Sequence, residues 1–239
     1  NDLIARLVVH TVIELADQLF TPMHIKQHRV MDEVLATVAD FFSDLVHWIK
    51  TPHHKESCIR QCLRRIGSMY LAALLKNQRP INWQRTKDGT HVIAQVDHDR
   101  EAVRKLLGKL QSKLEDAQSL QDEMQPWNVI RHLLLAKDTE GLGVWYSEFI
   151  ACFEKTQDHV RLAQDFKGIL GLKKEISRAD KVVALREFKS LLPGLLPPGG
   201  SDEDARARSR NALDASPGGN ASPSAAAKLG KKFLGFFKK

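Results

Sequence analysis

The chain has 239 residues, which is enough for one large domain or two small ones with a substantial core. Its 43% apolar and 27% charged residues are typical of a soluble globular protein. No apolar run approaches the roughly 18 to 20 residues of a membrane-spanning helix, because charged side chains interrupt every candidate stretch. This pattern excludes an integral membrane protein for this segment.

Cysteine content and the first residue bear on the compartment. The three cysteines, Cys58, Cys62 and Cys152, are few and odd in number, which argues against a disulfide framework and favours a reducing compartment. The chain begins at Asn1 without a methionine or a signal-like segment, so we expect a fragment whose N-terminal targeting cannot be read.

Glycine and proline are concentrated near the C-terminus. Residues 193–239 hold 7 of the 14 glycines and 5 of the 9 prolines. The first 192 residues therefore contain few turn-forming residues, which disfavours a fold of many short strands. They carry 28 basic and 25 acidic side chains, a balance that predicts no nucleic acid as a partner.

Apolar residues in the first 192 positions recur at spacings of three and four, which predicts amphipathic helices. One stripe lies in residues 31–49, a second in 59–75 and a third in 103–120. We therefore predict an all-α fold, an antiparallel helical bundle. The predicted helices span residues 2–20, 22–50, 53–76, 95–123, 126–137, 142–154, 157–171 and 177–191.

Two of these helices begin with capping signals. Thr51 places a hydroxyl before Pro52, and proline suits the first turn of a helix. Ser177 followed by Asp180 resembles a capping box with a shortened acid.

Composition also divides the chain into four parts. The longest break among the first 192 residues is the polar stretch around residues 77–90, which predicts a boundary between helical subdomains at 1–80 and 81–192. Residues 193–227 are rich in proline, glycine, serine and alanine, and they predict a disordered linker. Residues 228–239 form a separate tail.

No motif for common enzyme chemistry is present. The sequence lacks the glycine loops of nucleotide-binding proteins as well as GxSxG and HExxH. His54, Cys58 and Cys62 are spaced by four residues, as a zinc site requires, but the cysteines fall close to an apolar stripe, where cysteine acts as a small hydrophobe. We therefore predict no catalytic residue, cofactor or metal.

Paired carboxylates and tryptophans are interpreted as structural. Asp97 and Asp99 do not face one another on a helix, so they predict a solvated face rather than an acid–base pair. Trp48, Trp127 and Trp145 lie within amphipathic helices, and we expect them in the core.

The order of the helical segments is similar to a known pattern. The segments are CIRQCLRRIGSMYLAALLK, QVDHDREAVRKLLGKL, NVIRHLLLAKDTEGLGVWYSEFIACF and LAQDFKGILGLKKEISRADKVVALREFKSLL. Asp99 and the leucine ladder after it resemble a family helix in which an acid precedes paired aliphatic residues. Residues 169–172 followed by 177–180 resemble that family's late helix-turn-helix. Over about residues 30–192 the chain resembles the C-terminal region of the third exocyst component, the Sec-six subunit.

The resemblance implies a rod of antiparallel helical bundles stacked end to end, shared with other multisubunit tethering complexes. It implies a non-enzymatic subunit of the exocyst, which holds secretory vesicles at the plasma membrane before fusion. The implied partners are other exocyst subunits and SNARE proteins, and the implied location is cytoplasmic and peripheral at the plasma membrane. No partner site carries over residue by residue.

The tail, KLGKKFLGFFKK, combines large apolar side chains with five lysines and no acid. Its apolar residues recur at helical spacing and its lysines fall mainly on the other side, which predicts a basic amphipathic helix at an anionic phospholipid surface. The predicted membrane- or partner-binding residues are Lys228, Leu229, Lys231, Lys232, Phe233, Phe236, Phe237, Lys238 and Lys239.

Other roles for the tail stay open. It can fold back on the helical body. It can also serve as the protein-binding peptide of a generic helical adaptor or scaffold: Phe233, Phe236 and Phe237 imitate the aromatic core of a sliding-clamp ligand, although Gly230 stands where glutamine is expected.

Overall fold

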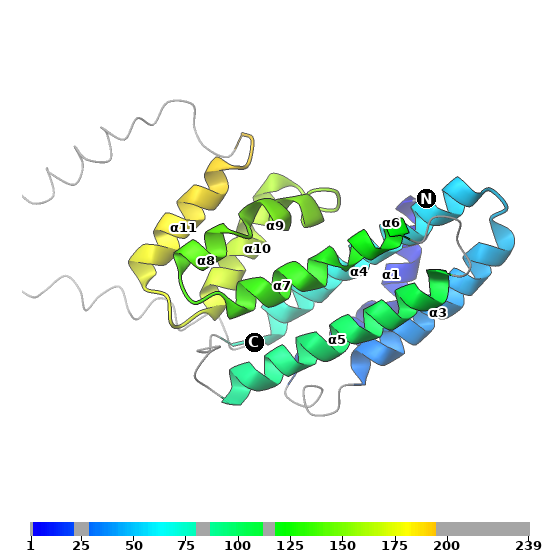
Figure 1. Cartoon of the computed structure of the whole chain (residues 1–239), viewed down its shortest axis with the longest axis horizontal. Coiled ribbons are helices and arrows are strands. Elements are labelled where there is room, and N and C mark those ends of the chain that lie inside the picture. Colours follow the sequence, from blue (N-terminus) through cyan, green and yellow to red (C-terminus); the bar gives the residue numbers. More distant parts are fainter. Residues whose placement is uncertain (1, 22–28, 80–86, 112–117, 195–239) are drawn as a thin grey trace, which may run out of the picture. The chain divides into compact units, whose positions relative to one another are not determined.

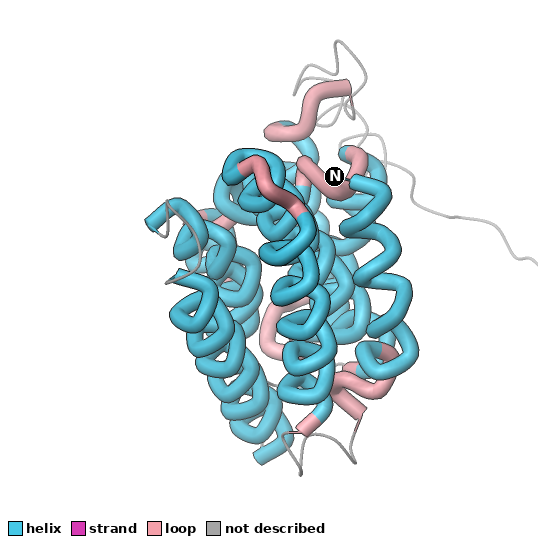
Figure 2. The backbone as a smooth tube through the Cα atoms, turned by 90° about the vertical axis from the view of Figure 1, so that its right-hand side faces the viewer, coloured by secondary structure: helices cyan, strands magenta, loops and turns pink. Residues whose placement is uncertain are grey.

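The computed structural model describes residues 2–21, 29–79, 87–111 and 118–194. Every regular element among these residues is a helix and none is a strand (Figure 1, Figure 2), which confirms the predicted all-α class. The elements are α1 (Asp2–Ala16), α3 (Val30–Trp48), α4 (Pro52–Asn77), α5 (Lys87–Gln111), α6 (Gln118–Gln121), the 3-10 helix η1 (Asp122–Met124), α7 (Gln125–Leu135), α8 (Thr139–Gly143), α9 (Tyr146–Phe153), α10 (His159–Leu172) and α11 (Arg178–Ser190).

The chain divides into two units, residues Asn1–Leu196 and residues Pro197–Lys239. The predicted tail and all but the first two residues of the predicted linker lie outside the described residues. The predicted boundary at residue 80 falls among residues 80–86, which are also outside the description, so the division into two subdomains stays a prediction.

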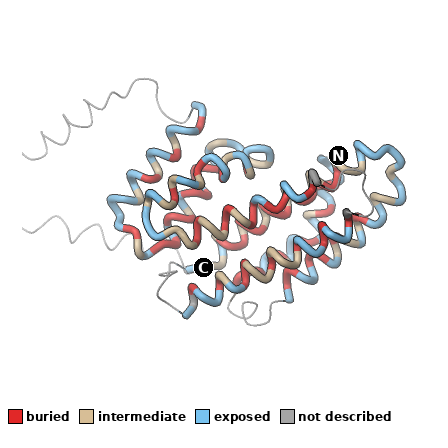
Figure 3. Tube along the Cα trace, viewed as in Figure 1, coloured by how far each residue is buried: buried red, intermediate tan, exposed pale blue. Residues whose placement is uncertain are grey.

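Helix α4 has the most neighbours in the first unit, because it contacts α1, α3, α7, α9 and α10. Its fully buried side chains include Ile59, Ile66 and Tyr70, which recur at helical spacing as the sequence predicts. Figure 3 shows the same recurrence of buried and exposed positions along the neighbouring helices. The apolar side chains of α4 therefore pack against several neighbouring helices.

Two glycines let other helices approach α4 closely. A Cβ added at Gly67 would lie 2.9 Å from Cβ of Pro126 at the start of α7. A Cβ added at Gly168 of α10 would lie 3.0 Å from Cδ2 of Leu75. Because these two positions have no side chain, α7 and α10 can pack closer to α4 than a residue with a Cβ would allow.

The end of α1 is tied to the end of α4. Phe20 has a φ of 62°, a left-handed conformation that is uncommon for a bulky residue, and its buried ring packs edge-on against Tyr70 at a centroid distance of 4.9 Å. Asn77 Nδ2 donates hydrogen bonds to the carbonyl oxygens of Asp17 at 2.9 Å and Leu19 at 2.7 Å. Side chains of α4 thus satisfy carbonyls that the end of α1 leaves without helical partners.

Three predicted helices differ from the observed ones. Of the predicted helix at 22–50, residues 22–28 are outside the description and α3 begins at Val30. In place of a helix at 95–123, α5 begins eight residues earlier at Lys87 and is described to Gln111, while residues 112–117 are outside the description. Residues 88 and 89, expected to be part of a break, belong to the first turn of α5.

The predicted helix at 142–154 is divided into α8 and α9. The Asp138 side chain caps α8 by accepting a hydrogen bond of 2.8 Å from the backbone N–H of Gly141. Trp145 lies in the turn between the two helices and stacks on His132 at a centroid distance of 4.1 Å. The turn thus places the Trp145 ring against α7. This contact could not be predicted from the residues around Trp145 alone.

The two predicted capping sites have different outcomes. At α11 the prediction is confirmed: the backbone N–H of Asp180 donates to Oγ of Ser177 at 3.1 Å, and the Ser177 hydroxyl donates to Oδ2 of Asp180 at 2.7 Å. At α4, Pro52 occupies the first turn as predicted, but the hydroxyl of Thr51 makes no capping hydrogen bond. At the start of α4, the sequence feature that correctly indicates the helix is the fixed φ of Pro52 rather than the hydroxyl of Thr51.

Candidate partner-binding groove

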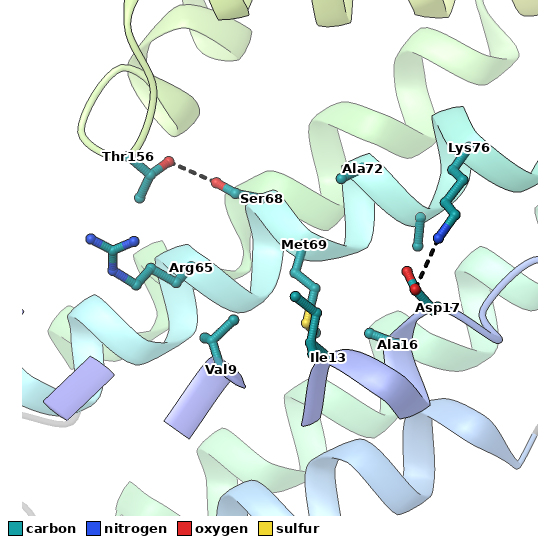
Figure 4. Close-up of a pocket in the computed structure, with 11 residues that line it drawn as sticks. Val9, Ile13, Ala16, Asp17, Arg65, Ser68, Met69, Ala72, Lys76 and Thr156 are labelled. Carbon is teal, nitrogen blue, oxygen red and sulfur yellow. Dashed lines mark hydrogen bonds and ion pairs between the residues drawn. The ribbon is translucent and has the colours of Figure 1, made fainter. Parts of the chain in front are cut away.

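A groove opens between α1, α4 and the turn that follows α9 (Figure 4). It has a volume of about 280 Å³. Its lining consists of Val9, Ile13, Ala16, Asp17, Arg65, Ser68, Met69, Ala72, Ala73, Lys76 and Thr156. We call this feature the α1–α4 groove.

Small side chains create the space. Ala16 of α1 and Ser68, Ala72 and Ala73 of α4 leave room between two helices that otherwise pack in contact. Ile13 borders the groove with 44% of its side chain exposed. The result is a mostly apolar hollow that is open to solvent.

Polar contacts hold the margins of the groove. Lys76 Nζ pairs with Oδ2 of Asp17 at 2.9 Å, and the hydroxyls of Ser68 and Thr156 are hydrogen-bonded at 2.6 Å (Figure 4). Arg65 of α4 binds Asp2 of α1, and this hydrogen bond lowers the pKa of the Asp2 carboxyl. These pairs join α1, α4 and the turn after α9 around an apolar floor.

Two further hollows continue along α4. One has a volume of about 240 Å³ and is lined by Asp2, Gln61, Arg64, Arg65, Lys155 and Thr156. The other has a volume of about 170 Å³ and is lined by His53, Glu56, Ser57, Arg60, Gln61 and Arg64. The α4 residues of all three hollows recur at spacings of three and four from His53 to Lys76, so one face of α4 remains accessible along most of the helix.

The charge of this accessible face changes along α4. Toward the start of the helix its hollows are lined by both charges, the cations Arg60, Arg64, Arg65 and Lys155 and the acids Asp2 and Glu56. Arg60 and Arg64 pair with Glu123 and Arg65 pairs with Asp2, whereas Lys155 forms no salt bridge with any described residue. Toward the end of the helix the lining is mostly apolar, and its charged residues Asp17 and Lys76 are paired with each other. Each hollow is smaller than the roughly 300–1,000 Å³ of a typical small-molecule pocket, whereas a row of hollows on a helix suits the side chains of a second helix.

Asp97 and Asp99 form no acid–base pair, but the predicted solvated face is wrong for Asp99. Asp97 pairs with Arg131 of α7 at 2.5 Å and with Arg100 at 2.8 Å. Asp99 is fully buried and accepts a hydrogen bond from the hydroxyl of Tyr70. A polar partner on a neighbouring helix, invisible in local sequence, allows this carboxyl to enter the core.

The candidate zinc residues also have separate surroundings. His54 is exposed, whereas Cys58 and Cys62 are buried, and burial raises the pKa of the Cys62 thiol to about 12. No group of three histidine, cysteine, aspartate or glutamate side chains able to hold a metal occurs within the part of the chain that the structure describes. The two thiols pack as small apolar groups.

The tryptophans among the described residues differ in burial. Trp127 is fully buried, as predicted, and Trp145 is partly buried against α7. The expectation for Trp48 is wrong, because 75% of its side chain is exposed. Trp48 is the last residue of α3, and no described residue covers its ring.

Sequence reasoning missed the α1–α4 groove as well. The small residues Ser68, Ala72 and Ala73 were the available signal, but their effect depends on which helix lies opposite. The predicted tail residues, from Lys228 to Lys239, lie outside the described residues. Across the described helices, none is both long and apolar enough to cross a membrane.

Comparison with known proteins identifies the family. No curated protein and no solved structure matches the chain. The family model of the exocyst complex component Sec6 matches residues 1–178, which include α1, α4 and the groove between them. This match covers more than half of the chain and agrees with the resemblance found in its helical segments. The chain therefore belongs to the Sec6 family of exocyst components, which are non-enzymatic tethering subunits with other exocyst subunits as partners.

Proposed function

We propose that this chain acts in exocytosis as a vesicle-tethering subunit and that the accessible face of α4 receives a helix from another exocyst subunit. Contacts with SNARE proteins and a peripheral position at the cytoplasmic face of the plasma membrane are part of the same proposal. The observation that carries it is the α1–α4 groove within the residues matched by the Sec6 family. A tethering subunit acts by binding other proteins, so its accessible apolar hollows are candidate contact sites.

The shape and charge of the α4 face specify the docking helix. Large aliphatic side chains spaced by three and four residues would fill the hollow beside Ala72 and Ala73. Acidic side chains one to two turns away would face Lys155, because Arg64 and Arg65 are already paired with Glu123 and Asp2. The expected partner segment is therefore an amphipathic helix with an acidic end and an aliphatic end.

A substitution that fills the groove tests this proposal. Ala72→Trp places a large ring in the hollow, while Ala36→Trp makes the same change at an exposed position of α3. With the other exocyst subunits co-expressed, we expect A72W to weaken their recovery with this chain about tenfold, a loss of about 1.4 kcal/mol. A36W is expected to leave recovery unchanged. Equal recovery with the two variants would remove the groove from the interface.

For the C-terminal tail, we propose contact with an anionic membrane. Five lysines near an anionic leaflet contribute about 1 kcal/mol each, which is enough for reversible attachment before the aromatic side chains are counted. Phe233, Phe236 and Phe237 would then lie in the interfacial region. The tail would add a membrane contact to the protein contacts of the α4 face.

Vesicle co-sedimentation tests the tail. We compare the intact chain with one that ends at Ala227, using vesicles that contain anionic lipid, at low and high salt. Salt-sensitive binding that disappears on truncation is the expected result, because exposed charges are screened by salt. If both chains stay in solution, the tail needs a protein partner, as in the adaptor interpretation of the sequence.

A further inference from the structure

The turn between α3 and α4 presents a tryptophan to solvent. Trp48 ends α3 with 75% of its side chain exposed, whereas Trp127 is fully buried. Its ring meets the ring of His47 edge-on at a centroid distance of 5.1 Å. Tryptophan is enriched where one end of a side chain meets an apolar phase and the other meets water, as at protein and membrane interfaces. An exposed indole at this position therefore indicates a contact surface.

Basic residues are close to this tryptophan in the sequence. Residues 47–55, which we call the α3–α4 tip, contain two lysines and three histidines and no acid. Lys50 Nζ donates a hydrogen bond of 2.8 Å to the carbonyl oxygen of His47, which holds the ammonium group next to the end of α3. Glu56, the first acid after the tip, is bound by Arg60 at 2.8 Å. Asp44 is an exposed acid one turn before Trp48, so over residues 44–55 two lysines stand against one acid and the formal charge is positive.

The surface around Trp48 differs from the accessible face of α4. Trp48 and Lys50 line none of the three hollows described along α4, although His53 of the tip borders the smallest of them. An acidic peptide helix needs a groove with matching side-chain holes. A turn with one exposed indole and flanking cations instead suits a planar surface of negative charge.

We propose that the α3–α4 tip contacts an anionic lipid bilayer, with the Trp48 indole in the interfacial region and Lys50 and Lys55 facing lipid headgroups. Tryptophan favours the headgroup level of a membrane, and lysines near anionic lipid add electrostatic attraction. This contact is separate from the C-terminal tail and would give the helical body its own membrane-facing end.

Quenching of tryptophan emission by brominated phospholipid tests the position of the indole. The full chain is mixed with phosphatidylcholine–phosphatidylserine vesicles with and without brominated acyl chains. Trp48→Phe is the matched variant, because it retains the other three tryptophans and an aromatic ring. We expect bromolipid to quench the intact chain and the quenching to be largely lost in W48F. The same fractional quenching in both would overturn the proposal.

Charge reversal tests the lysines. The double variant Lys50→Glu, Lys55→Glu is compared with Lys137→Glu, Lys174→Glu, which makes the same change in net charge at exposed positions elsewhere. We expect the tip variant to lower the vesicle partition coefficient at least about tenfold relative to the control variant. Equal losses would show a general charge effect and would contradict the proposal. Circular dichroism of each variant checks that the helices are retained.

A tail variant separates the two membrane contacts. With Phe233, Phe236 and Phe237 changed to serine in the full chain, bromolipid quenching attributable to Trp48 is expected to persist. Its disappearance would assign the bilayer contact to the tail alone and overturn the proposal. A Trp48 emission change on adding polyglutamate, without any change on adding vesicles, would also overturn it by assigning the tip to an acidic protein segment.

Discussion

The hydroxyl of Tyr70 donates a hydrogen bond of 2.9 Å to Oδ2 of Asp99, and this bond joins α4 to α5 inside the core. Gln95 Nε2 donates to the other carboxyl oxygen at 2.6 Å. Burial raises the pKa of Asp99 to about 6, while the hydrogen bonds from Tyr70 and Gln95 act in the opposite direction. His98, whose Nδ1 lies 3.6 Å from Oδ1, also lowers the pKa of this carboxyl. Asp99 is thus a buried acid whose ionised form depends on three neighbouring side chains.

Removal of the Tyr70 hydroxyl should therefore destabilise the fold. Tyr70→Phe is expected to lower the free energy of unfolding by about 1–3 kcal/mol near neutral pH, because a buried acceptor loses its donor. Tyr146→Phe is the control, since the Tyr146 hydroxyl has no hydrogen-bond partner within the described residues. Urea unfolding followed by circular dichroism measures both. Equal effects of the two substitutions would contradict the role of the Tyr70–Asp99 bond.

The pKa of Asp99 predicts a specific pH dependence. The native value of about 6 lies above the ordinary value of 3.8, so between these values the native state binds a proton that the unfolded chain has released. The favourable contribution of Asp99 is therefore fully present below pH 3.8 and is lost as the pH rises to about 6. Asp99→Asn places an uncharged side chain at this position, so the pH-dependent contribution of Asp99 to the free energy of unfolding is absent from the variant.

The comparison is made by denaturant titration across this pH range. Relative to the unsubstituted chain, D99N is expected to gain about 3 kcal/mol in the free energy of unfolding between acid and neutral pH. A difference between the two chains that does not change with pH would contradict the assignment of this titration to Asp99.

Close packing of α4 against α7 predicts the effect of a methyl group. Gly67→Ala places a Cβ 2.9 Å from Cβ of Pro126, so the helices must shift, and we expect destabilisation of about 1–3 kcal/mol. Gly108→Ala on α5 meets no atom within 4 Å and is expected to stabilise its helix by up to about 1 kcal/mol. Thermal unfolding of the two variants should shift in opposite directions, and a shared direction would exclude the packing explanation.

The buried lysine after α10 predicts a coupled pair. Lys173 Nζ donates to the carbonyl oxygen of Leu134 at 2.8 Å and pairs with Glu175 at 3.0 Å, and burial lowers the pKa of its ammonium group. Lys173→Met leaves the Glu175 carboxylate with no cation, so we expect a loss of about 3–5 kcal/mol in the free energy of unfolding.

The matching double variant provides the test. Addition of Glu175→Leu to Lys173→Met removes the uncompensated charge and is expected to recover most of the stability. Chemical unfolding of the single and double variants measures the coupling. If the double variant is as unstable as K173M, the loss comes from the Leu134 contact rather than from the unpaired carboxylate.

Much of the helical architecture could be predicted from sequence because burial repeats at the helical period. Ile59, Ile66 and Tyr70 indicate the buried face of α4, and Ser177 with Asp180 marks the start of α11. These signals are local, since each depends on residues within one helix or one turn. They do not depend on knowing which helices become neighbours.

The groove and the exceptional side chains could not be predicted in this way. The hollow beside Ala72 exists because α1 lies at a particular distance, and Asp99 enters the core because Tyr70 is opposite. Trp48 is exposed because α3 ends at that residue and no helix of the described residues covers its ring. Each feature depends on the relation between elements that are separate in sequence.

The tie between the ends of α1 and α4 has a consequence for binding. Asn77 binds two carbonyls of the turn that follows α1, Asp17 pairs with Lys76, and α7 packs closely against α4 at Gly67. Both walls of the groove are therefore in place before a partner arrives. The entropic cost of ordering on binding therefore comes mainly from the incoming segment. Affinity for this subunit should then increase with the helical content of that segment in isolation.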